Sequence, residues 1–154
     1  MRLILFLMLA GTGIITCCKT PQKISFEPVL QGISGTVTVV SGNQMPRIGQ
    51  SPATPKAFPT KVFFYEPTDI TQVNRVNGSP FYTSIYTKMV SSVETDSTGA
   101  FKQALPTGNY SVFVQVNKQF YANSFDIRNN IFLVQVEEGK LTEIKIVVNN
   151  AASY

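Results

Sequence analysis

The chain has 154 residues, a formal net charge of +4 and no histidine. Its basic residues stand singly and form no run that could follow a phosphate backbone, so we expect no nucleic-acid partner. The absence of histidine excludes Ser-His and Cys-His nucleophilic pairs. Cysteine occurs only at Cys17 and Cys18, which excludes a disulfide or a cysteine-based metal site in the rest of the chain.

The N-terminus reads as an export signal. Arg2 precedes an apolar run, Leu3–Ile15, which is shorter than the roughly 20 residues that span a bilayer as a helix. The aliphatic and small residues before Cys17 resemble the lipobox of bacterial lipoproteins, a family in which the new N-terminal Cys carries the lipid. The resemblance implies lipidation at Cys17, with Cys18 as the alternative register. The competing interpretation is an ordinary signal or N-terminal membrane anchor with two idle cysteines.

The chain then divides into a tether and one domain. Residues 1–17 are the predicted lipoprotein signal peptide with its lipobox, residues 18–31 contain two prolines and few apolar residues and predict a tether, and residues 32–154 have the size of a single domain. Because an extended chain covers at most about 3.6 Å per residue, the tether keeps the domain within a few nanometres of its membrane.

The first half of the domain predicts strands separated by loops. Ile33–Val39 alternates apolar and polar residues with a period of two, as a half-buried strand does. Residues 41–60 are rich in glycine and proline and predict a long surface loop. Lys61–Glu66 predicts a second strand, residues around Ile70–Val73 a single helical turn, and Phe81–Tyr86 a further extended segment.

The second half continues in the same way. Asp96–Gly99 predicts a hairpin between two strands, and Pro106–Asn109 a second turn, which together predict antiparallel neighbours. No window has helical spacing. The pattern predicts an all-β fold, a single Greek-key β-sandwich of about seven to nine strands, with a closed barrel as the alternative. The predicted strands of this half are Lys88–Thr95, Ala100–Leu105, Tyr110–Val116, Phe120–Phe125, Ile131–Val136 and Leu141–Asn149.

Three segments resemble the pattern of carboxypeptidase regulatory-like domains, which have a transthyretin-like or prealbumin-like sandwich: Gly32–Val37, Thr95–Phe101 and Leu105–Val112. The chain is also similar to a narrower set of bacterial envelope proteins with such a domain, through Gly42–Pro46 and Ala122–Asp126. The resemblance implies this fold and no peptidase activity, since the regulatory-like domain lies outside the zinc-bearing catalytic unit.

The motif residues have structural explanations. Asp96 and Gly99 suit a tight turn, as do Pro106 and Gly108. Tyr110 is expected to bury its ring while its hydroxyl reaches a backbone group, as in the tyrosine corners of other sandwiches. We therefore interpret the motif as scaffold, with direct binding as the alternative.

The acidic residues do not predict catalysis. Each carboxylate has a simpler explanation as a turn former or a solvated strand edge, so we expect a non-enzymatic protein without a cofactor. Calcium is an alternative ligand without EF-hand spacing to support it, and its candidate oxygen donors are Asp96, Asp126, Asn129 and Asn130.

The aromatic residues carry the strongest functional signal. Adjacent pairs such as Phe63-Phe64 must point to opposite faces of a strand, so some rings are expected at the surface. One interpretation is a partner-docking patch of Tyr82, Tyr86 and Tyr121, and the other is packing under the long loops.

These observations predict a lipid-anchored protein of a Gram-negative cell envelope. We expect it at the outer membrane, on the periplasmic side, as an interaction or accessory module for another envelope protein. A glycan- or peptide-binding lipoprotein and a carrier for a small ligand are the alternatives.

Overall fold

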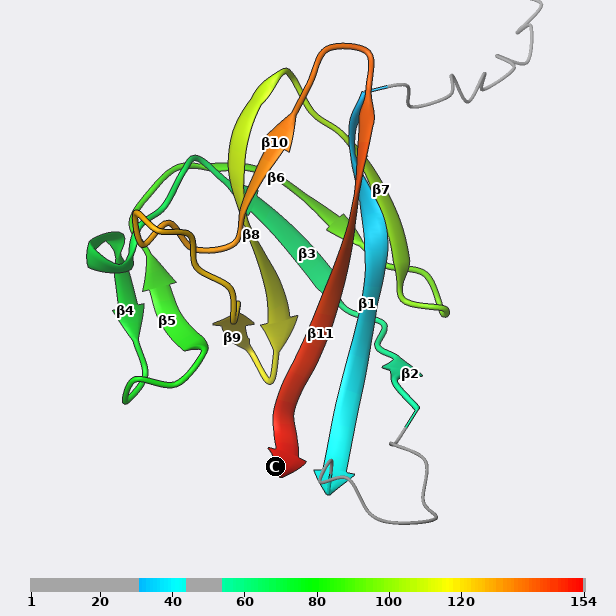
Figure 1. Ribbon diagram of the computed structural model, residues 1–154, viewed down its shortest axis with the longest axis vertical. Helices are drawn as coiled ribbons and strands as arrows, with labels where there is room; N and C mark the ends of the chain where they lie inside the picture. The colour runs from blue at the N-terminus through cyan, green and yellow to red at the C-terminus, as the bar shows by residue number, and fades with distance from the viewer. Residues whose placement is uncertain (1–30, 44–53, 154) are drawn as a thin grey trace, which may run out of the picture.

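The computed structural model describes residues 31–43 and 54–153, which form two packed β-sheets (Figure 1). The smaller sheet has the long strand β1 (Gly32–Asn43) at its centre. On one side β1 pairs in parallel with β11 (Leu141–Ser153). On its other side β1 pairs antiparallel with β7 (Ala100–Ala104) and β2 (Lys56–Ala57).

The larger sheet has seven strands, and β8 is its central member. One edge of β8 pairs with β3, and the other edge is shared by β9 and β10. A 3-10 turn, η1 (Ile70–Gln72), precedes β4. The strand order is β4 (Val73–Arg75), β5 (Phe81–Ile85), β9 (Gln119–Tyr121), β8 (Gly108–Val116), β3 (Lys61–Tyr65) and β6 (Met89–Glu94), with β10 (Leu133–Val136) beside β9 on β8.

The predicted all-β, two-sheet sandwich is confirmed, and so is the helical turn near Ile70. The described residues contain more strands than expected, because β2 and β4 are too short to show an alternating pattern. The predicted strand Phe120–Phe125 is shortened to β9. After Tyr121 the chain no longer pairs with β8, and the rest of that edge of β8 pairs with β10. Within the described ranges no helix has the length and hydropathy of a transmembrane span.

The predicted hairpin at Asp96–Gly99 is a turn of the expected kind, but its two strands do not stay paired. The Asp96 N–H donates to Ala100 O at 2.8 Å, which closes the turn. Beyond it the Val37 N–H donates to Gly99 O at 2.8 Å, so β7 joins β1 in the smaller sheet while β6 stays with β3 in the larger one. The turn before β8 also connects the two sheets, so the expectation of antiparallel neighbours was wrong for both connections.

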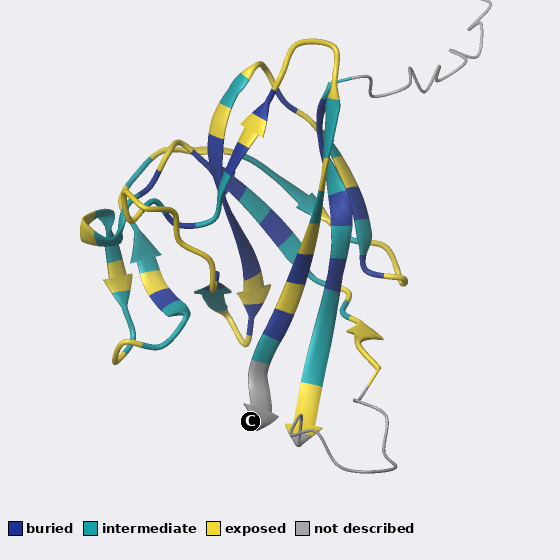
Figure 2. Ribbon diagram, viewed as in Figure 1, coloured by how far each residue is buried: buried dark blue, intermediate teal, exposed yellow. Residues whose placement is uncertain are grey.

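The main core lies between the two sheets. Side chains from alternate positions of β1 and β11 face those of β3 and β8, as the alternation of buried and exposed residues along these strands indicates (Figure 2). Its centre consists of Ile33, Val37, Ile146 and Val148 from the smaller sheet and Val62, Phe64, Val112 and Val114 from the larger sheet.

A second apolar cluster covers the outer face of the larger sheet. Phe113 and Tyr65 alternate with the inward-facing residues of β8 and β3, and both are buried. Thr68 and Ile131 close this cluster, because the Ile131 N–H donates to Thr68 O at 2.8 Å while the Thr68 N–H donates to Ser111 Oγ at 2.9 Å. The larger sheet is therefore packed on both faces.

Candidate interaction surface

The predicted N-terminal signal and the predicted lipidation at Cys17 or Cys18 lie outside the described ranges. Of the three predicted contact tyrosines, Tyr82 and Tyr121 are 0% and 1% exposed, whereas Tyr86 is 70% exposed. A shared patch of these three side chains is therefore ruled out, and Tyr86 alone is accessible to a partner.

Tyr82 belongs to the outer aromatic cluster. Its ring meets Phe113 edge-on with centroids 5.6 Å apart, and its hydroxyl donates to Ala122 O at 3.3 Å. Burial raises the pKa of this phenol above 10.0, an effect that the positive charge of Arg75 partly opposes. These contacts give Tyr82 a packing role.

Tyr121 connects the two sheets. It lies on β9 of the larger sheet, and its hydroxyl donates to Asn149 Oδ1 at 2.6 Å and accepts from the Asn149 N–H at 3.2 Å. Asn149 lies on β11, which forms an edge of the smaller sheet. Sequence alternation predicted that Phe120 and Tyr121 face opposite sides, but not that β11 covers the tyrosine.

The expectation that adjacent aromatic residues face opposite sides is confirmed. Phe64 packs in the core between the sheets, whereas Phe63 packs in the outer cluster, where its ring lies edge-on to Phe120 at 5.1 Å. Packing therefore accounts for most of the aromatic excess. Tyr110 also behaves as predicted, with a buried ring and a hydroxyl that donates to Pro106 O at 2.9 Å.

Three of the six large exposed apolar side chains in the described ranges lie within five residues, Tyr86 just after β5 and Met89 and Val90 at the start of β6. Tyr86, Met89 and Val90 are 70%, 50% and 40% exposed, and we call them the Tyr86–Val90 surface. The other large exposed apolar residues of the described chain are Phe125 and Ile127, which lie between β9 and β10, and Val147 on β11. Exposed apolar residues that cluster are typical of binding surfaces, whereas isolated ones are ordinary.

The backbone beneath this surface is fixed by hydrogen bonds. The Tyr86 N–H donates to Gln72 O at 2.9 Å, and Lys88 O accepts from the Glu66 N–H at 3.0 Å. Between them the Thr87 hydroxyl lies 2.6 Å from the hydroxyl of buried Thr68. The exposed side chains therefore extend from a rigid support, which lowers the entropy that binding would cost.

The same surface lies at an open edge of the larger sheet. Among the described strands β6 pairs only with β3, and the Thr95 N–H donates to Thr60 O on that side. The backbone N–H and C=O groups of successive residues in a strand point alternately to its two edges, so those of Ser92 and Glu94 point to the free edge. A register shift leaves Val90 without a partner residue on β3, as in a β-bulge.

Asp96 and Asp126, two of the candidate calcium donors, accept hydrogen bonds from the backbone of their own turns. Asp126 Oδ1 accepts from the N–H groups of Arg128 and Asn130, each at 2.8 Å, and Asp96 Oδ1 accepts from the Thr98 and Ala100 N–H groups. Within the described ranges no group of three or more His, Cys, Asp or Glu side chains is placed to hold a metal ion.

No protein-family model matches the chain, and a search of curated proteins finds no match either. The resemblance to carboxypeptidase regulatory-like domains thus stays a prediction from sequence motifs. The two-sheet architecture, by contrast, is a property of the structure.

Proposed function

We propose that this protein is a non-enzymatic, lipid-anchored module of a Gram-negative envelope that binds another protein through the Tyr86–Val90 surface. The observation that carries the proposal is the gathering of Tyr86, Met89 and Val90 on one rigid segment at an open sheet edge. Aromatic residues and methionine are enriched in protein interfaces, and tyrosine is frequent among the residues that dominate binding energy.

The edge of β6 offers two kinds of contact at once. Its outward backbone groups at Ser92 and Glu94 can pair with an extended segment of a partner, while the apolar side chains beside them supply burial. Complete burial of one large apolar side chain contributes about 1.5–3 kcal/mol, so burial of these residues would add to the backbone pairing in opposing the entropic cost of association.

The envelope location rests on the N-terminal sequence. The apolar run Leu3–Ile15, followed shortly by Cys17 and Cys18, supports export and lipidation, and β1 begins at Gly32, immediately after the predicted tether. Intact-mass analysis of membrane-extracted protein tests this part of the proposal. Cleavage directly before Cys17 or Cys18 with added acyl mass is expected, and an unmodified soluble species would contradict it.

Site-specific photo-crosslinking tests the binding surface. A photoreactive amino acid replaces Tyr86 in one sample and Val147 in a matched control, because Val147 is also exposed and lies in the other sheet. We expect one discrete protein adduct from position 86 and none from position 147. Equal crosslinking from both positions would refute the assignment of the surface.

Substitution of the same side chains gives the second test. The combined variant Tyr86→Ser, Met89→Ser and Val90→Ser should lose a partner that the unmodified protein captures from solubilised membranes, while Val147→Ser retains it. Specific glycan binding that the triple variant preserves, without any protein adduct, would favour the alternative of a glycan-binding lipoprotein.

A further inference from the structure

The two long terminal strands of the domain lie side by side and run in the same direction. The pairing of β1 with β11 extends from Gly32 with Leu141 to Asn43 with Ser153, and its register shifts once, after Val39. The chain enters β1 at the end of the sandwich that carries the β10–β11 turn, and β11 finishes at the opposite end (Figure 1).

This arrangement determines how the strands respond to tension. A force applied before Gln31 and after Ser153 draws β1 and β11 in opposite directions along their axes. The hydrogen bonds between the strands are then loaded together, because neither strand can slide without straining the whole ladder. A force applied to both strands at the same end would instead open the bonds one after another.

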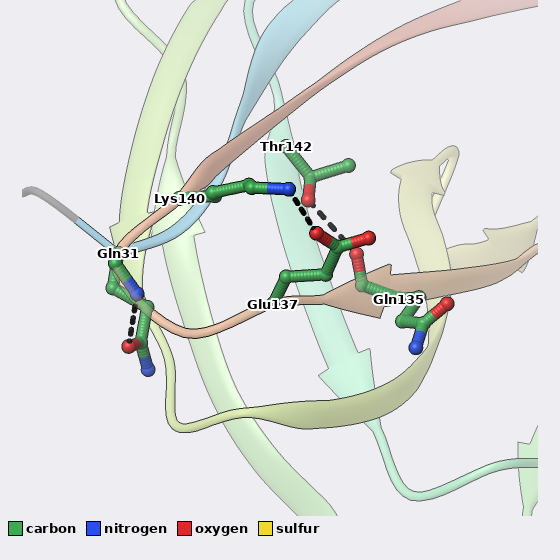
Figure 3. A network of polar contacts seen from close by, with 6 residues as sticks. Gln31, Gln135, Glu137, Lys140 and Thr142 are labelled. Carbon is green, nitrogen blue, oxygen red and sulfur yellow. Dashed lines mark hydrogen bonds and ion pairs between the residues drawn. The ribbon is translucent and has the colours of Figure 1, made fainter.

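The start of β1, where tension would be applied, is held by hydrogen bonds of Gln31 and Gly32, which we call the latch. The Gln31 Nε2 donates to Leu105 O at 3.0 Å. The Gly139 N–H donates to Gln31 Oε1, also at 3.0 Å (Figure 3). The next residue, Gly32, donates its N–H to Lys140 O at 3.1 Å. The start of β1 is therefore tied to the turn before β8 and to the β10–β11 turn.

The β10–β11 turn that holds this latch is itself braced. The Lys140 ammonium forms an ion pair with the Glu137 carboxylate across the turn (Figure 3). The Thr142 hydroxyl donates to Gln135 O at 2.8 Å and joins the start of β11 to β10. The turn thus connects the latch on the smaller sheet to a strand of the larger sheet.

β11 is also held along its length. At Gly35 a Cβ would lie only 2.1 Å from Ile144 O, so β1 and β11 approach more closely than a larger residue permits. On the opposite side of β11, the Tyr121 hydroxyl bonds Asn149 near the end of the sandwich core. The edge strand is therefore secured by both sheets.

We infer that β1 and β11 form a mechanical clamp, so that the domain resists tension applied between the start of β1 and the end of β11. This inference does not depend on the partner surface proposed above or on the chemistry of the N-terminal attachment.

Single-molecule force spectroscopy tests the clamp. The whole chain carries Cys17→Ser and Cys18→Ser, so that no native thiol competes with the handles. In the first geometry the handles are attached at the two ends of the chain, which shears β1 against β11. In the second, one handle stays at the N-terminal end and the other is attached through Glu138→Cys in the β10–β11 turn, which peels the strands from one end.

The expected result is a several-fold higher mean unfolding force in the first geometry at the same loading rate, since the direction of force changes the barrier that limits forced unfolding. Urea unfolding of both handle-free proteins verifies that their equilibrium stabilities match. Equal forces in the two geometries, or a lower force end to end, would overturn the inference.

Discussion

The hydroxyl of Tyr121 offers a direct measurement of how the two sheets are joined. Tyr121→Phe removes this single polar atom and keeps the ring, whose centroid lies 5.3 Å from that of Phe81 in the core. The variant loses the two hydrogen bonds that the hydroxyl makes with Asn149 on β11, at 2.6 Å and 3.2 Å, and a longer contact with Val147 O at 3.4 Å. No other change in packing is expected, because phenylalanine occupies the same space.

The magnitude follows from those two hydrogen bonds. A typical hydrogen bond within a protein contributes a net 0.5–1.5 kcal/mol, so their loss should lower the free energy of unfolding by about 1–3 kcal/mol. The matched control is Tyr86→Phe, the same chemical change at a side chain that is 70% exposed. Such a surface substitution is expected to change stability by less than about 0.5 kcal/mol.

Urea unfolding followed by circular dichroism measures both variants. We expect the midpoint to fall for Tyr121→Phe and to stay unchanged for Tyr86→Phe, with the slope of the transition the same in all three proteins. If Tyr121→Phe unfolds at the same urea concentration as Tyr86→Phe, the hydroxyl does not join β9 to β11 in solution, and the reasoning is refuted.

Three further substitutions test other contacts. Gly35→Ala should lower the free energy of unfolding by about 3 kcal/mol in a urea titration, because its Cβ would overlap Ile144 O, whereas a loss below about 1 kcal/mol would contradict the close approach of the strands. Gln31→Ala should lower the free energy of unfolding by about 1–3 kcal/mol in the same assay through the loss of its two hydrogen bonds, and an unchanged midpoint would show that the latch is open. Hydrogen bonds from the Thr98 side chain and from the Ala100 and Thr98 backbone hold the pKa of Asp96 below 3.8. Because the pKa of Asp96 is lower in the folded than in the unfolded protein, its ionised form stabilises the fold. This stabilisation is complete above pH 3.8 and is lost as the pH falls through the lowered pKa. Asp96→Asn should therefore reduce the loss of stability between neutral pH and about pH 3, and an unreduced loss would assign the acid sensitivity to other carboxyl groups.

Local sequence patterns predicted most strands, because alternation and turn residues act over a few positions. Ile33–Val39 and the Asp96–Gly99 turn are examples, and both agree with the structure. The assignment of strands to sheets was less predictable. Whether β7 pairs with β6 or with β1 depends on contacts between Gly99 and Val37, which lie far apart in the sequence.

The candidate surface was only partly visible in the sequence. Tyr86 was expected to be accessible, but alternation alone could not reveal that Tyr82 and Tyr121 are covered, since the covering residues come from remote segments. Met89 and Val90 were not singled out. Two adjacent apolar residues break the alternation of apolar and polar side chains expected along β6. This break is the sequence signal that could have indicated the bulge and its exposed side chains.

The proposed binding surface and the inferred clamp belong to different sheets, so substitutions can separate them. The edge of β6 lies in the larger sheet, whereas β1 and β11 belong to the smaller one, and Tyr121 connects the two sheets. A partner strand added to β6 would leave the β1–β11 ladder unchanged. We therefore expect the triple serine variant at Tyr86, Met89 and Val90 to lose partner capture and keep its end-to-end unfolding force, and Tyr121→Phe to keep partner capture and unfold at a lower force. If the triple variant lost both properties, partner binding and force resistance would share one structural element, and the separation argued from the sheet topology would be wrong.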